Sequence, residues 1–122
     1  MSLSTSTKGY YYLFVSFDVC CRGAKSTYRI MVGRATWLTG PYRDRAGGRM
    51  DHGAATQVLA GSGRYRGPGG QSILVEGSTY LLVYHYYDAS DNGVSKLQIM
   101  PIHWSRDGWP AVSPSGRFVS PV

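Results

Sequence analysis

The side chains in this 122-residue sequence that could do acid–base chemistry are few and lie far apart. Asp18 and Asp88 each end a run of aromatic and apolar residues, and Glu76, the single glutamate, lies at a predicted hairpin tip. Hydrolysis by general acid–base catalysis needs carboxyl groups on both sides of one bond. Carboxylates at strand ends and turns more commonly accept backbone N–H bonds. We therefore interpret all three as turn residues.

His85 stands within Val83–Tyr87, a run that otherwise has the composition of a buried strand. A lone histidine among aromatic residues is most often structural, and a side chain that lines a functional cavity is the alternative. His52 and His103 have only loop or strand-end surroundings, and their spacing from the cysteines predicts no metal site.

The two cysteines, Cys20 and Cys21, are adjacent. A disulfide between sequence neighbours is strained and rare, and no third cysteine could close a longer loop. Nucleophilic catalysis by either thiol would need a matching base, and the sequence presents none. The pattern therefore favours neither a long-loop bridge nor a catalytic thiol.

A glycine-rich segment, RGPGGQ, spans residues 66–71. Such a segment can cradle phosphate when a helix follows it and a lysine reaches the phosphate, but neither is present here. We instead expect residues 51–71 to form a long loop of the kind that lines a functional surface.

Antiparallel β-strands must position these residues, so we predict an all-β fold. Ten Tyr favour strands, sixteen Gly favour turns and bulges, and no window has the apolar spacing of a long helix. The expected strands are Tyr10–Asp18, Ser26–Arg34, Ser72–Val75, Thr79–Asp88, Lys96–Trp104 and Trp109–Val112. A long aromatic strand, a polar turn and an alternating strand occur in this order twice, which fits the blades of a β-propeller.

The formal charge of +6 raises the question of nucleic-acid binding. Ten of the thirteen basic residues are arginines that are dispersed along the chain, and no platform of basic and aromatic residues is evident. No apolar run is long enough to span a membrane. We expect neither nucleic acid nor membrane as a partner.

The two ends differ in composition from the rest. Residues 1–8 are small and polar, lack the pattern of a signal peptide, and predict a disordered leader or a remnant of cloning. Residues 113–122 contain Pro and Gly and predict a surface tail.

Six segments of residues 9–112 together resemble the arabinanases of glycoside hydrolase family 43. In order they read YYYLFVSFD with CCRG, STYRIMVGR, TGPY, RGPGGQS, LVYHYYDA with NG, and DGWPAV. The resemblance implies a five-bladed β-propeller with its active site in the central cavity. By length, residues 9–112 would hold about the last two blades, so the chain resembles the C-terminal piece of an enzyme.

The resemblance implies inverting hydrolysis of α-1,5-linked arabinan, in which one carboxylic acid protonates the leaving oxygen and a carboxylate activates water. In the family the acid belongs to a motif just before the position of Gly9, and both aspartates lie further upstream. Here residues 1–8, MSLSTSTK, contain no acidic residue before Gly9. The family's catalytic carboxylates are therefore missing, and we carry no catalytic residue onto this sequence.

The resemblance does imply a set of substrate-binding or cavity-lining candidates: Cys20, Cys21, Arg22, Gly70, Gln71 and His85. In many arabinanases a histidine in the place of Gly70 helps to hold a central metal ion through water. Because that histidine is replaced by Gly70, we expect no cofactor and no metal ligand in this chain.

Two functions follow from these observations. The first is the C-terminal part of an arabinan-degrading glycosidase that is inactive as an isolated chain. The second is a stand-alone β-sheet module for carbohydrate binding or assembly. Both have arabinan or arabino-oligosaccharide as partner. Self-association is also expected, because the edge of Tyr10–Phe17 would lack a strand to pair with.

Overall fold

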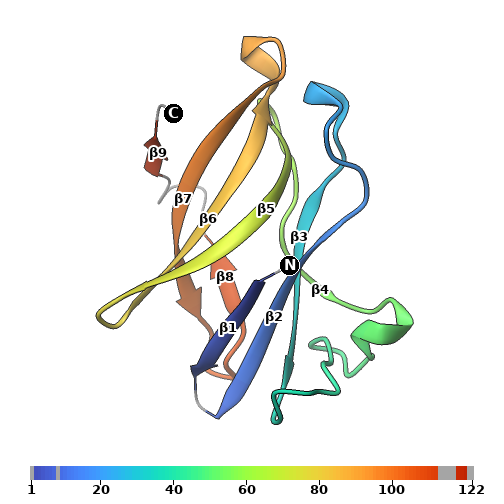
Figure 1. Cartoon of the computed structure of the whole chain (residues 1–122), viewed down its shortest axis with the longest axis vertical. Coiled ribbons are helices and arrows are strands. Elements are labelled where there is room, and N and C mark those ends of the chain that lie inside the picture. The colour runs from blue at the N-terminus through green and yellow to red at the C-terminus, as the bar shows by residue number, and fades with distance from the viewer. Residues whose placement is uncertain (1, 8, 113–117, 121–122) are drawn as a thin grey trace.

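The computed structural model describes residues 2–7, 9–112 and 118–120, with side chains for residues 9–112, and is built of strands and short 3-10 turns (Figure 1). The strands are β1 (Ser2–Thr7), β2 (Tyr10–Phe17), β3 (Arg29–Ala35), β4 (Thr56–Leu59), β5 (Tyr65–Glu76), β6 (Thr79–Asp88), β7 (Val94–Trp104), β8 (Pro110–Val112) and β9 (Phe118–Ser120). The 3-10 turns are η1 (Gly23–Lys25), η2 (Met50–His52) and η3 (Ala89–Asp91). Among the described residues, no helix is long and apolar enough to cross a membrane.

The strands form two antiparallel sheets, so the all-β prediction is confirmed. The first sheet has the order β1-β2-β3-β4, and the second has the order β5-β6-β7-β8 with β9 also paired to β7. In the first sheet Phe14 pairs with Val32, and in the second Val83 pairs with Ile99. Figure 1 shows the two sheets side by side, with the long β5–β6 hairpin extending away from the first sheet.

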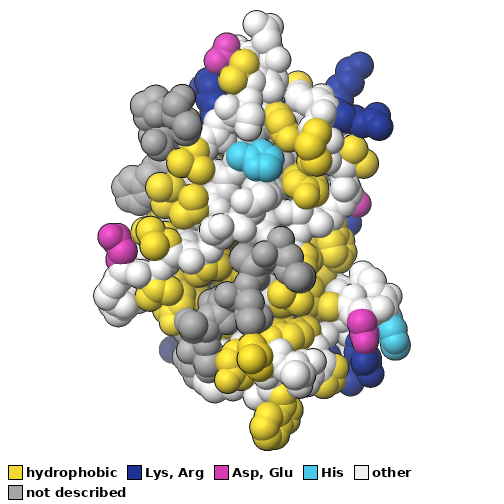
Figure 2. All heavy atoms as spheres, in the orientation of Figure 1, with side chains coloured by type: hydrophobic (Ala, Val, Ile, Leu, Met, Phe, Trp, Pro, Cys, Tyr) yellow, Lys and Arg dark blue, Asp and Glu magenta, His cyan; other side chains and the backbone are white. Residues whose placement is uncertain are grey.

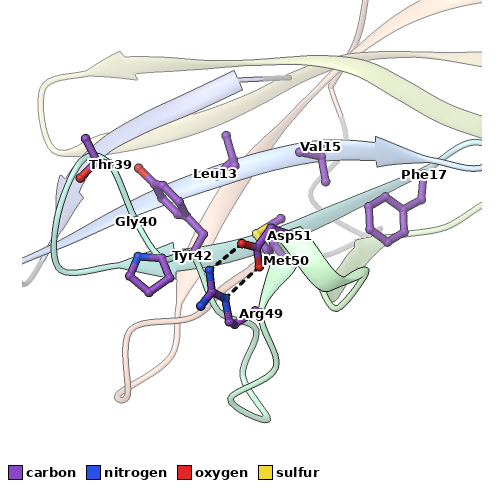
Figure 3. A pocket seen from close by; sticks show the side chains of 10 residues that line it. Leu13, Val15, Phe17, Thr39, Gly40, Tyr42, Arg49, Met50 and Asp51 are labelled. Atoms are coloured by element: carbon purple, nitrogen blue, oxygen red, sulfur yellow. Dashed lines mark hydrogen bonds and ion pairs between the residues drawn. The ribbon is translucent and has the colours of Figure 1, made fainter.

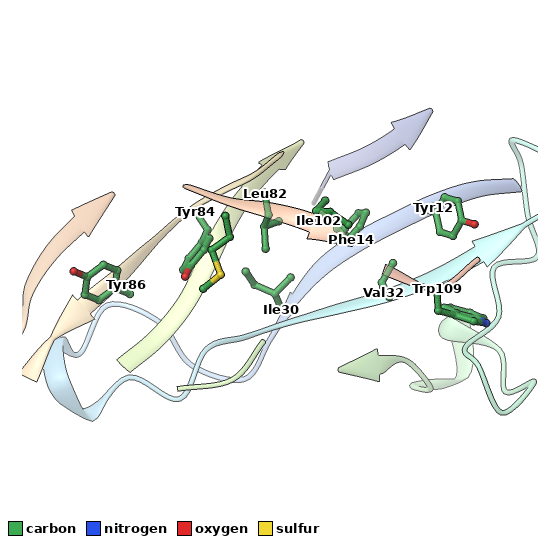
Figure 4. Close-up of a cluster of buried hydrophobic side chains, with 10 residues drawn as sticks. Tyr12, Phe14, Ile30, Val32, Leu82, Tyr84, Tyr86, Ile102 and Trp109 are labelled. Carbon is green, nitrogen blue, oxygen red and sulfur yellow. The ribbon is translucent and has the colours of Figure 1, made fainter. Parts of the chain in front are cut away.

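The hydrophobic core lies between the two sheets (Figure 4). Because side chains alternate along a strand, one face of each sheet supplies it. Its fully or almost fully buried members are Tyr12, Phe14, Ile30, Val32, Leu82, Tyr84, Tyr86, Met100, Ile102 and Trp109. The hydroxyl of Tyr12 donates to the carbonyl of Gly108 at 2.6 Å, which joins β2 to the turn before β8. The core therefore fixes how the two sheets sit against each other.

Both ends of the chain contain strands where the sequence predicted a leader and a tail. Ser2–Thr7 pairs with β2, with Leu3 opposite Leu13, and Phe118–Ser120 pairs with β7. A neighbouring edge strand offers backbone partners to any extended segment, and Thr suits a strand. The edge of β2 that was expected to be unpaired is therefore paired. Residues 1, 8, 113–117 and 121–122, on which the rest of these two predictions falls, lie outside the described residues.

The loop predicted for residues 51–71 is wrong at residues 56–59 and 65–71, which lie in strands. β4 occupies Thr56–Leu59, and β5 begins at Tyr65, so the glycine-rich segment is part of a strand. The pairing of β5 with β6 shifts register between Arg66 and Gly69 and again between Gly69 and Ser72. Glycine tolerates such bulges, which is why a composition typical of loops here forms an irregular strand.

On the face shown in Figure 2, apolar side chains cover more of the surface than charged side chains do. Hydrophobic side chains are spread over much of this face, from its upper to its lower part, while Lys and Arg lie apart near its edges. The dispersal of arginine along the sequence is thus matched by dispersal on this surface.

Candidate functional site

The loop between β2 and β3 carries three of the candidate residues and closes tightly on itself. The carbonyl of Val19 accepts the N–H groups of Thr27 and Tyr28 at 2.8 and 2.9 Å. Within the loop, the N–H of Arg22 donates to Oγ of Ser26 at 2.9 Å. The exposed Arg22 side chain lies on this loop where η1 packs against β5, β6 and β7.

Cys20 and Cys21 are joined by a disulfide, a pairing that the sequence marked as rare. Asp18 and Cys21 both have positive φ, 71° and 68°, and Gly23 follows with 56°. Non-glycine residues seldom adopt this left-handed conformation, and they persist in it only where surrounding contacts hold them. Contacts of the folded loop hold Cys21 in this conformation. Two adjacent cysteines in a sequence do not reveal such contacts.

Tyr87 joins this loop to the second sheet. Its hydroxyl accepts the N–H of Cys21 at 2.9 Å, and its side chain is buried. Its ring meets the His85 ring edge-on, with 5.3 Å between centroids. No motif in the sequence singles out Tyr87, but its position two residues after His85 on one strand puts both side chains on the same face of the sheet.

Gly70 lies directly against His85. A Cβ atom built on Gly70 would be 2.6 Å from Nδ1 of His85, and the φ of Gly70 is 58°. Both the space and the backbone conformation therefore require glycine here. The N–H of Gly70 donates to Oγ of Ser16 on β2 at 3.3 Å, which draws the two sheets together at this point.

Gln71 braces the same junction. Oγ of Ser16 donates to its Oε1 at 2.7 Å, and its Nε2 donates to the carbonyl of Phe14 at 3.1 Å. Its side chain is 4% exposed. The two bonds satisfy an amide oxygen and an amide N–H of Gln71 within the protein, so this residue holds strands β2 and β5 together beside Gly70.

Burial lowers the pKa of the His85 imidazole below its usual value, which favours the uncharged form of the ring. Its Nε2 is buried and has no hydrogen-bond partner among the described residues. Tyr28, whose ring centroid is 6.3 Å away, contributes a second aromatic neighbour. A neutral imidazole with one free nitrogen can donate to or accept from a hydroxyl group.

The structure thus brings together most of the predicted site residues. Cys21 and His85 both contact Tyr87, Gly70 lies against His85, and Gln71 follows Gly70 on β5. We call this group, with Cys20, the His85 cluster.

The three carboxylates of the sequence analysis lie in ordinary structural settings. Asp88 caps the η3 turn through the N–H of Ser90 at 3.0 Å, as predicted, and binds Arg64 and Lys96. Asp18 pairs with Arg29 at 2.8 Å on the surface. Glu76 is exposed at the end of the β5–β6 hairpin.

The residues around Gly70 do not by themselves fit the metal ion that the family resemblance implies. Gly70 has no side chain, and the neighbouring space is filled by the His85 ring. No group of three His, Cys, Asp or Glu side chains in the described part of the chain could hold a metal.

A second feature is a hollow of about 590 Å³ on the other face of the first sheet (Figure 3). Leu13, Val15 and Phe17 of β2 form its floor. The Arg49 guanidinium and the Asp51 carboxylate lie at its rim and make two hydrogen bonds of 2.9 and 2.6 Å. The face of β2 that points away from the core is therefore apolar and partly uncovered.

Comparisons with known proteins agree with this architecture. The family model "Glycosyl hydrolases family 43" matches residues 4–110. The chain is 50% identical over 107 residues to an extracellular endo-α-(1→5)-L-arabinanase of Bacillus subtilis, covering 88% of this chain and 32% of that protein. It is 43% identical over 103 residues to an extracellular exo-α-(1→5)-L-arabinofuranosidase of Cellvibrio japonicus, covering 84% and 30%.

A solved structure of a Cellvibrio cellulosa α-L-arabinanase complexed with arabinohexaose matches with a TM-score of 0.90 and 38% identity. The match covers 94% of this chain and 36% of that one. The chain thus spans about a third of the length of the relatives it matches. Since the family model covers most of the sequence, the chain belongs to glycosyl hydrolase family 43.

Proposed function

We propose that this chain is the C-terminal part of an arabinan-degrading glycosidase. The intact parent would hydrolyse α-1,5-L-arabinofuranosidic bonds with inversion, and the two sheets would be about the last two blades of a five-bladed β-propeller. The observation that carries the proposal is the His85 cluster, in a chain similar over 94% of its length to an arabinanase solved with arabinohexaose.

In this proposal the His85 cluster forms one wall of the sugar-binding cavity. The exposed backbone at Gly70 lets a sugar ring come close, and the half-buried His85 ring lies directly beside this backbone. Cys20, Cys21 and the exposed Arg22 line the neighbouring loop. None of these groups is a pair of carboxyl groups placed for inverting hydrolysis.

The isolated chain should therefore bind arabino-oligosaccharides without hydrolysing them. Losing a general acid alone typically costs about 10²–10⁴-fold in rate. The assay is release of reducing sugar from linear arabinan, run beside calorimetric titration with arabinohexaose. Activity that follows the protein through purification, and disappears in Asp18→Asn or Asp88→Asn, would contradict the proposal.

A stand-alone carbohydrate-binding module is the second candidate. The pairing of β1 with β2 favours it, because the first sheet then has the strand it was expected to lack. Sugar binding by the chain, together with cooperative unfolding of a stable monomer, would support this candidate over a dependent fragment.

Self-association of the isolated chain is the outcome we propose for the apolar face of Leu13, Val15 and Phe17. The occupant is a second copy of the chain, related by a two-fold axis that lets the same face contact itself. The side chains of Leu13, Val15 and Phe17 line an open hollow of about 590 Å³, and exposed apolar faces of this kind commonly mark interaction surfaces.

A further inference from the structure

We propose that the Cys20–Cys21 disulfide is a positioning device for Tyr87 and His85, and that a dithiol reductant releases both. The sugar-binding consequence rests on the proposed function, but the positioning itself does not. Four observations lead to it.

The first is the shape of the loop. Asp18 and Cys21 are both non-glycine residues with positive φ, and they lie within four positions of each other. Residues in this conformation cluster at functional sites and need surrounding structure to stay there. The disulfide closes a small ring through the peptide bond of Cys20 and Cys21, and this ring restricts the backbone at Cys21.

The second is the contact made at the constrained residue. The N–H of Cys21 points to the hydroxyl of Tyr87, at 2.9 Å. This bond crosses from the first sheet's loop to the second sheet. The direction of that N–H depends on the φ of Cys21, so the disulfide and the Tyr87 hydroxyl are coupled through the backbone.

The third is the packing around Tyr87. A Cβ on Gly67 would lie 3.1 Å from Cδ2 of the Tyr87 ring, and the His85 ring closes the other side with a 5.3 Å centroid distance. A Cβ on Gly70 would in turn meet His85 at 2.6 Å. The two rings thus have close neighbours on several sides, and the Tyr87 hydroxyl is tied only to the cysteine loop among the bonds described.

The fourth is access. Cys21 is exposed, so a small dithiol can reach the bond. Exchange proceeds through a mixed disulfide, after which the second thiol of the reductant displaces the protein sulfur. The products are two protein thiols, on Cys20 and Cys21, and the oxidised cyclic reductant. Two electrons and two protons pass from the dithiol to the protein.

After reduction the ring formed by the disulfide is open, and no covalent bond restricts Cys21 to the left-handed region. We expect the N–H of Cys21 to turn away from Tyr87, and the Tyr87 and His85 rings to sample several orientations. Affinity for an arabino-oligosaccharide should then fall by about tenfold, which corresponds to the loss of one well-placed interaction.

The test is NMR of the uniformly labelled chain before and after treatment with dithiothreitol. The carbon-bound ring proton of His85, assigned with His85→Gln, should shift or broaden on reduction. The ring protons of His52 and His103 serve as internal controls and should stay unchanged, because both side chains are exposed and lie outside the His85 cluster. Intact mass reports whether reduction is complete.

The matched variant is the double change Cys20→Ser and Cys21→Ser, which should show the reduced-state His85 signal and no response to dithiothreitol. If that variant does not fold, the His85 signal of the wild-type chain before and after reduction still tests the proposal. Circular dichroism then checks that the reduced wild-type chain stays folded. An unchanged His85 signal after complete reduction overturns the proposal, as do two free thiols in the untreated chain. Global unfolding on reduction also overturns it.

Titration with arabinohexaose distinguishes failure of the positioning role from failure of the proposed function. A His85 shift with a tenfold loss of affinity supports both the positioning role and the proposed function. A His85 shift without sugar binding in either redox state supports positioning and counts against the proposed function. If the affinity for arabinohexaose and the His85 signal are both the same before and after reduction, the positioning role alone is overturned.

Discussion

Single residues in the His85 cluster are constrained by what lies directly beside them. Gly70 is the sharpest case, because both its φ of 58° and the 2.6 Å approach of His85 exclude a side chain. Gly77 has nearly the same φ, 59°, but nothing lies within 4 Å of the Cβ position. The two glycines therefore separate the cost of backbone conformation from the cost of a clash.

Gly70→Ala should lower the free energy of unfolding more than Gly77→Ala does. The left-handed conformation alone costs alanine about 1–2 kcal/mol, which both variants incur. Displacement of His85 adds to this only at position 70, by roughly 1–3 kcal/mol as in overpacked cores. Urea unfolding measures both variants. Equal losses would mean that His85 moves aside freely.

The buried Asp88 carboxylate joins the ends of neighbouring strands through charged hydrogen bonds. Asp88, at the end of β6, is fully buried and accepts hydrogen bonds from Arg64, Lys96 and Ser90. These bonds hold the pKa of its carboxyl group well below the usual value. The arrangement ties the residue just before β5, the end of β6 and the start of β7 together. Gly70 and His85 lie further along β5 and β6.

Asp88 should make stability depend on pH. A carboxyl with a lowered pKa in the folded state stabilises the fold fully above its unfolded pKa of about 3.9. That contribution falls progressively as the pH drops below this value. Asp88→Asn should therefore lower the urea midpoint at pH 7, and the difference from wild type should shrink toward pH 2.

Asp18→Asn is the control for this experiment, because the exposed Asp18 carboxylate pairs with Arg29 at the surface. Surface pairs contribute about 0–1 kcal/mol, so this variant should unfold much like the wild type at pH 7. A pH-independent difference between Asp88→Asn and wild type would show that packing, and not charge, explains the role of Asp88.

Burial differs sharply along the β5–β6 hairpin. Leu82→Ala, in the core between the sheets, should cost about 2–5 kcal/mol of unfolding free energy, because it removes buried methyl groups and leaves a cavity. Leu74→Ala, at 47% exposure on the neighbouring strand, should change it by about 0.5 kcal/mol or less. Denaturant titration compares the two. Similar losses would place the core elsewhere.

At the scale of the whole molecule, the two sheets share one core and leave an apolar face of β2 open. Light scattering should detect a dimer or larger species of the isolated chain. Val15→Asp, on the floor of the hollow, should shift it toward monomer, whereas Val94→Asp, on an exposed site of the second sheet, should not. A stable wild-type monomer over a wide concentration range would refute this proposal.

The sequence alone determined the all-β class and the family resemblance, because aromatic and glycine patterns and ordered motifs are local properties of the chain. It also placed Asp88 at a turn. Only the tertiary structure decided that Ser2–Thr7 and Tyr65–Gln71 lie in strands, because an edge strand or a bulged register supplies partners that no local pattern contains.

The same division holds at the site. The sequence selected Cys21, Gly70, Gln71 and His85 as separate candidates, but it did not select Tyr87, which connects them. Contacts between residues 66 positions apart depend on how two sheets pack, and not on composition. The disulfide between neighbouring cysteines follows the same rule, since the folded loop holds Cys21 in a conformation that an isolated chain seldom adopts.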